Sequence, residues 1–86
     1  MPDLDDLERV LTDGYACVLQ TEGERSRLRA QLEERTAVIG DKPDRREIVE
    51  ITGLVRGIAR ADNEIEEFRQ ALDRLAARAR TLRKAS

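Results

Sequence analysis

The stretch ITGLVRGIARADNEIEEFRQALDRLAARARTL, residues 51–82, decides the fold of this chain. Apolar side chains recur in it at alternating steps of three and four residues, a heptad spacing that places them on one side of an α-helix. Every position of this seam is apolar: Ile51, Leu54, Ile58, Ala61, Ile65, Phe68, Leu72, Leu75, Ala79 and Leu82. The pattern predicts a helix over about residues 44–84. Since a lone helix is only marginally stable in water, its seam needs a partner.

A less regular stripe in the first half of the chain predicts that partner, a helix over about residues 3–39. Its apolar members are Leu4, Leu7, Leu11, Val18, Leu28, Leu32 and Ile39, and its other positions are Gly14, Thr21, Arg25 and Arg35. Gly23 lies inside this segment, and an interior glycine costs about 1 kcal/mol relative to alanine. Thr21 and Glu24 also have the spacing of a cap at which a helix restarts. We favour one helix kinked at Gly23 over two separate helices.

A short polar link separates the two patterns. Residues 40–43, Gly-Asp-Lys-Pro, combine a helix stop with a proline that suits a first helical turn. Asp44 and Glu47 then have the spacing of a capping box. A turn of this length joins neighbouring antiparallel helices. We therefore predict an all-α fold, an antiparallel helical hairpin of the coiled-coil type, that forms a single domain over residues 1–86.

The charge distribution supports the same hairpin. Residues 1–24 contain seven acidic side chains and one basic one, whereas residues 69–86 contain six basic side chains and one acidic one. An antiparallel turn at residues 40–43 brings these two segments together. Each segment also complements its own helix dipole, an effect of about 0.3–1 kcal/mol per contact.

Several apolar residues lie beside the seams and cannot all be covered by one neighbouring helix. They are Val10, Leu19, Val38, Val49, Val55, Ala71 and Ala76. Two kinds of partner would cover them. A second copy would form a homodimeric four-helix bundle around a two-fold axis, and a different protein would lay its own helices along the hairpin. Of these, we expect the homodimer.

The composition disfavours several classes of function. The chain has 86 residues, no histidine and a single cysteine, Cys17, so the commonest general base and a structural zinc site are both missing. We expect no catalytic site, no bound metal and no cofactor. The net charge of −2 gives no general attraction to nucleic acid, and direct nucleic acid binding is not expected. The acidic N-terminal segment and the absence of an apolar run of about 20 residues predict a cytoplasmic protein without a membrane anchor.

One small-residue row suggests a ligand site. Gly53, Gly57 and Ala61 recur at steps of four, and a turn centred near residues 41 and 42 places the polar Ser26 near Gly57. The same alignment places Glu22 near Ala61 and Arg29 near Leu54. Five arginines surround this predicted notch: Arg25, Arg27, Arg29, Arg56 and Arg60. They suit a phosphate or a nucleotide. The alternative is a close helix crossing in which these arginines pair with Glu22, Glu24, Glu33, Glu50 and Asp62.

Five residues on one face of the first helix have the spacing of a known signature: Glu22, Ser26, Arg29, Glu33 and Ala37. They resemble the Glu-x3-Ser-x2-Arg-x3-Gln-x3-Asp pattern of the actinobacterial anti-sigma factor family, which binds cyclic di-GMP on an antiparallel helical coiled coil. Three positions match. Glu33 replaces the glutamine of the pattern, and Ala37 replaces an aspartate expected to help orient a guanine. The resemblance implies that Glu22, Ser26 and Arg29 meet a guanine and its phosphate, and that the protein partner is a sigma factor.

Three functions follow as hypotheses. The first is a small non-enzymatic regulatory module that binds or sequesters a protein, such as a transcription regulator, through its coiled-coil faces. The second is an anti-sigma factor that senses a cyclic dinucleotide at Glu22, Ser26 and Arg29, with Glu33, Arg25, Arg56 and Arg60 around the ligand. The third is a purely structural homodimeric coiled coil.

Overall fold

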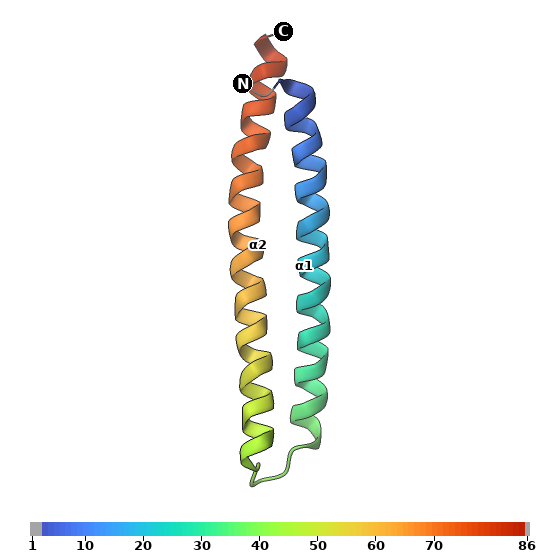
Figure 1. Cartoon of the computed structure of the whole chain (residues 1–86), viewed down its shortest axis with the longest axis vertical. Coiled ribbons are helices and arrows are strands. Elements are labelled where there is room, and N and C mark those ends of the chain that lie inside the picture. The colour runs from blue at the N-terminus through green and yellow to red at the C-terminus, as the bar shows by residue number, and fades with distance from the viewer. Residues whose placement is uncertain (1–2, 86) are drawn as a thin grey trace.

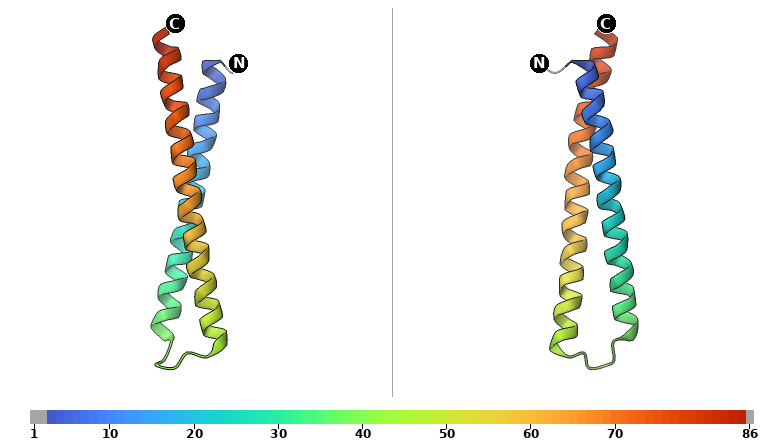
Figure 2. Two further views of the ribbon diagram at one scale, coloured as in Figure 1. Left: turned by 90° about the vertical axis from the view of Figure 1, so that its left-hand side faces the viewer. Right: turned by 45° about the vertical axis from the view of Figure 1, so that its right-hand side comes forward.

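The computed structural model describes residues 3–85, which form two long helices and one connection (Figure 1). α1 spans Leu4–Val38 and α2 spans Arg45–Ala85. The two helices run side by side in opposite directions, and Figure 2 shows them crossing at a shallow angle. The predicted all-α antiparallel hairpin is confirmed. It is a thin rod of 65 × 15 × 14 Å. The single domain predicted over residues 1–86 includes Met1, Pro2 and Ser86, which lie outside the described residues.

Local hydrogen bonds set both helix starts. The Asp3 side chain accepts a hydrogen bond from the Asp6 backbone N–H at 2.9 Å. At α2, the Glu47 N–H donates to Asp44 Oδ1 at 2.8 Å, and the Asp44 N–H donates to Glu47 Oε1 at 3.3 Å. This reciprocal pair is the predicted capping box, which satisfies backbone donors that a helix start leaves unpaired. Pro43 precedes the cap and is not part of the first turn.

The end of α1 differs from the expected glycine stop. Ile39 leaves the helix in an extended conformation, with φ −78° and ψ 136°. Gly40 does not have the positive φ of a glycine cap. The connection therefore occupies residues 39–44, slightly more than the predicted residues 40–43.

Gly23 does not interrupt α1, which is one helix from Leu4 to Val38 and shows no sharp bend in Figure 1. The Thr21 hydroxyl donates to the Cys17 carbonyl oxygen at 3.1 Å, one turn back in the same helix. Thr21 is therefore a buried helical residue and caps no new helix. The expected kink is wrong because buried residues before Gly23, and half-buried ones after it, hold α1 against α2.

The core is narrow, as two helices alone require. Its centre is the cluster of Val18, Ile65 and Leu72, with Leu11 packed against it. The buried hydrophobic residues are Leu7, Val18, Ala61, Ile65, Leu72 and Ala79. Phe68 belongs to the predicted seam but remains 41% exposed. A single neighbouring helix covers only part of so large a side chain.

The register of the two helices differs from the one predicted. Gly57 faces Leu28, two residues beyond Ser26, and Gly14 faces Leu72. Glu22 forms an ion pair with Arg69, although the prediction placed it near Ala61. The predicted register took the middle of the turn as its reference. The observed register follows the packing of the two apolar seams, which outweighs the geometry of a short polar link.

Candidate functional site

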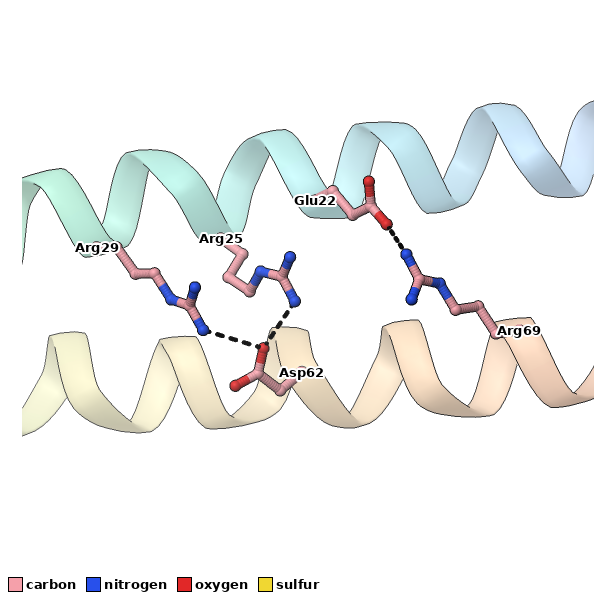
Figure 3. Close-up of polar contacts among 5 residues, drawn as sticks. All are labelled: Glu22, Arg25, Arg29, Asp62 and Arg69. Carbon is pink, nitrogen blue, oxygen red and sulfur yellow. Dashed lines mark hydrogen bonds and ion pairs between the residues drawn. The ribbon is translucent and has the colours of Figure 1, made fainter.

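Two arginines of α1 converge on one carboxylate of α2 (Figure 3). Arg25 Nη1 donates to Asp62 Oδ1 at 3.1 Å, and Arg29 Nη2 lies 3.9 Å from the same oxygen. The Nε of Arg25 is buried and has no hydrogen-bond partner. Two positive groups thus share one negative group, and one donor stays unsatisfied. This is the feature of the hairpin that most resembles an anion site.

These residues belong to a longer row of ion pairs across the hairpin. We call this row the ionic edge, and it consists of the pairs Glu8–Arg83, Glu22–Arg69 and Arg29–Asp62. Successive pairs are separated by fourteen and then seven residues on both helices, so whole heptads relate them and they lie along one side of the rod. All of these side chains are partly exposed. Each pair therefore contributes about 0–1 kcal/mol to folding.

The structure brings together only some of the residues predicted to bind a ligand. Glu22 and Arg29 belong to the ionic edge, and Arg25 contacts it through Asp62 (Figure 3). Arg60 is exposed and precedes Asp62 by two residues, so it points about 160° away from Asp62 around α2. Arg56 is exposed and points about 120° away from Asp62. The predicted ring of arginines around one notch therefore does not form.

The remaining predicted positions, Ser26 and Glu33, are exposed on α1. Sequence reasoning did not identify Arg69 as the partner of Glu22. The signal was present, because Arg69 follows Asp62 by one heptad, just as Glu22 precedes Arg29 by one heptad. Opposite charges at matching heptad positions indicate such cross-helix pairs.

The small-residue row does not form the predicted notch at Gly57. A Cβ atom placed at Gly57 would lie 3.2 Å from Leu28 Cδ1, so the Leu28 side chain already occupies that space. The close helix packing that we considered as the alternative is what the structure has there. Of the two glycines in this row, Gly53 is the open one, with no atom within 4 Å of an added Cβ. It borders a shallow depression beside Leu54 and Gln31.

A second surface lies more than 90° around each helix from the ionic edge. We call it the apolar edge, and it consists of Val10, Gly14 and Cys17 on α1 with Phe68 and Ala71 on α2. The spacings of four, three and three residues keep each set on one side of its helix. The close contact of Gly14 with Leu72 joins the two sets.

Exposed apolar side chains occur both on the apolar edge and outside it. The large ones are Val10, Tyr15, Leu19, Val38, Ile48, Val49, Val55 and Phe68. Within residues 3–85, neither helix contains a segment that is long and apolar enough to cross a membrane.

Comparison with family models finds no match, and neither the curated proteins nor the solved structures contain a match to this chain. Function is therefore inferred from the geometry of the described residues.

Proposed function

We propose that this chain is a non-enzymatic regulatory module that binds a protein partner through the apolar surface of the hairpin. The observation that supports this proposal is that the hairpin exposes more surface than a compact protein of the same mass. The chain exposes 6834 Å² for a mass of 9.8 kDa. A compact protein of that mass exposes about 5,200 Å². A bound helical partner would cover this excess.

The exposed side chains give this surface its binding energy. Val10 is 51% exposed and Phe68 is 41% exposed, although both are apolar and lie on regular helices. Fully burying one such side chain contributes about 1.5–3 kcal/mol. A hairpin is one layer of a helical domain, and a second layer is the usual way to bury its remaining apolar face. Binding of helices from a partner thus follows from the same packing rules as the hairpin itself.

Site-specific photo-crosslinking in cells tests this function. We expect a crosslinking amino acid in place of Phe68 to yield an adduct with one discrete protein. The matched control replaces Gln70, which is exposed on another side of α2 and should give no adduct. Equal labelling at the two positions, or no adduct at Phe68 or at Val10, would contradict the proposal.

A second candidate function is that of a cyclic-dinucleotide-sensing anti-sigma factor. The observation that favours it is the convergence of Arg25 and Arg29 on one Asp62 oxygen, with the Arg25 Nε left without an acceptor. A phosphate offers more acceptor oxygens than this single carboxylate provides. Two features weigh against it: Glu22 is engaged with Arg69, and Leu28 fills the space at Gly57.

Calorimetric titration with cyclic di-GMP tests this second candidate. If the site binds the nucleotide, Arg29→Ala should abolish binding and leave the unfolding free energy within about 1 kcal/mol, because an exposed ion pair contributes little to folding. Arg56→Ala is the matched control, since Arg56 points away from Asp62, and it should bind like the wild type. Absence of any binding heat with the wild-type protein would eliminate the sensor function and leave the interaction module.

A further inference from the structure

The apolar edge lies in the half of the hairpin that is farther from the connection. Its side chains are apolar or only weakly polar. At its centre the Leu72 side chain lies directly against Gly14, because a Cβ at Gly14 would lie only 2.4 Å from Leu72 Cδ2. Val10 and Phe68 flank this point with about half of each side chain uncovered, and Cys17 and Ala71 are exposed beside it. Three of its five residues are therefore small, so another helix pair can pack close to the backbone.

The charges that border this edge differ between the two helices. On α1, Asp6 and Asp13 are exposed and lie one turn from Val10. On α2, Arg74 and Glu67 are exposed and each lies one turn from Ala71. Asp13 and Arg74 lie at nearly the same height along the rod, because their neighbours Gly14 and Leu72 are in contact. The α1 border of the apolar edge is thus acidic, and Arg74 is the basic group of the α2 border that lies at the height of Asp13.

We propose that a second copy of this chain covers the apolar edge, in a four-helix bundle whose two-fold axis runs along the hairpin. This inference rests on the proposed function and names its partner. A two-fold axis in this direction places each α1 against α2 of the other copy at the same height. Asp13 of one copy then lies opposite Arg74 of the other, at two symmetric positions.

Other arrangements of two copies satisfy fewer of these features. If two copies lay side by side along their full length in opposite directions, the apolar edge of one copy would face the mixed charges near the connection of the other. A pair that meets through the ionic edge would bury Glu22, Arg29 and Asp62 with their partners, and desolvation of such pairs is costly. The axial two-fold through the apolar edge neither places apolar residues on these charges nor buries the ion pairs of the ionic edge.

The uncovered area also fits a second copy. The hairpin exposes about 1,600 Å² more than a compact chain of its mass. Obligate homodimers bury about 1,000–2,500 Å² on each subunit. The excess exposed area of each copy is therefore as large as the area that a stable dimer buries on each subunit.

The oligomeric state of the full chain is the first test. We expect sedimentation of the wild type to give the mass of a dimer at micromolar concentration. Phe68→Asp should give a monomer that stays helical, because Phe68 is 41% exposed within one hairpin. Val49→Asp is the matched control and should remain dimeric, since Val49 lies outside the apolar edge. A monomeric wild type, or a dimer that Phe68→Asp does not affect, would overturn the inference.

Charge reversal tests the pairing without altering the apolar residues. Asp13→Arg and Arg74→Asp should each weaken the dimer about tenfold, because each places like charges opposite each other at two symmetric positions. The double variant should regain most of the lost affinity. Additive losses in the double variant would overturn the pairing of Asp13 with Arg74.

A distance measurement tests the direction of the two-fold axis. A spin label at Lys42→Cys, in a Cys17→Ser background, reports the separation of the two connections. An axial two-fold predicts a distance of about 20 Å between the two labels, the width of two helices. Two copies that lie side by side in opposite directions predict a distance of about the rod length, 65 Å. The longer distance would overturn the axial arrangement. If the wild type is monomeric but position 68 still crosslinks to a different protein, the homodimer inference fails and the proposed interaction module stands. If the wild type is monomeric and no adduct forms, both the homodimer inference and the proposed function fail.

Discussion

Replacing Ile65 with aspartate is expected to unfold the hairpin. Ile65 is 3% exposed and lies in the cluster with Val18 and Leu72. The cluster consists of apolar side chains, so the new carboxylate would lose its hydration among groups that cannot hydrogen-bond to it. Such burial costs several kcal/mol. A protein of this size is stable by only about 4–13 kcal/mol.

Far-UV circular dichroism and urea unfolding measure this effect. Val49→Asp is the matched control, because it makes a similar change on the same helix at a residue that is 61% exposed. It should change the unfolding free energy by no more than about 0.5 kcal/mol. Full helicity and an unchanged midpoint for Ile65→Asp would show that the core is assigned to the wrong face of α2.

The heptad seam of α2 was the most reliable feature of the sequence. Ala61, Ile65, Leu72 and Ala79 are buried as the spacing predicts. Phe68 has the same spacing but is partly exposed. Spacing defines which side of a helix faces its partner, whereas the depth of burial depends on how many helices surround that side. A single chain supplies only one neighbour.

Local signals differ in how well they determine structure. Asp44 and Glu47 form their capping box because both partners lie within one turn and no other contact competes. The cost of Gly23 inside a helix, about 1 kcal/mol, was overestimated as a reason for a kink. Packing of Val18 and Leu28 against α2, on either side of Gly23, outweighs this cost.

The candidate ligand site was less predictable than the fold because it depends on the register of α1 against α2 and on the direction in which each side chain leaves its helix. A shift of two residues turns a helix by about 200°, so the residue that faces Gly57 is the apolar Leu28 and not the polar Ser26. Nearness in sequence also placed Arg60 beside the predicted notch, although its side chain leaves α2 in nearly the opposite direction from that of Asp62. The sequence shows which charged residues are available, but only the packed register decides which of them meet.

The close approach at Gly14 gives the second large effect. Gly14→Leu should lower the unfolding free energy by about 1–3 kcal/mol, because the added side chain overlaps Leu72 and a packed core tolerates extra volume poorly. A Cβ alone would lie 2.4 Å from Leu72 Cδ2, and Leu72 is 3% exposed, so it cannot move aside without losing its own burial. Gly23→Leu is the matched control. No atom lies within 4 Å of its Cβ position, and higher helix propensity should stabilise the protein by about 0.5–1 kcal/mol.

A double-variant cycle shows whether the cost arises from this contact. Leu72→Ala alone should cost about 2–5 kcal/mol through the cavity it leaves. In the double variant the new leucine at position 14 occupies part of that cavity, so the combined loss should be smaller than the sum of the two single losses. Urea unfolding of the four proteins, followed by circular dichroism, measures the difference. Losses that add to within about 0.5 kcal/mol would mean that the two positions do not touch. The register that places Gly14 against Leu72, and with it the position of the apolar edge, would then be wrong.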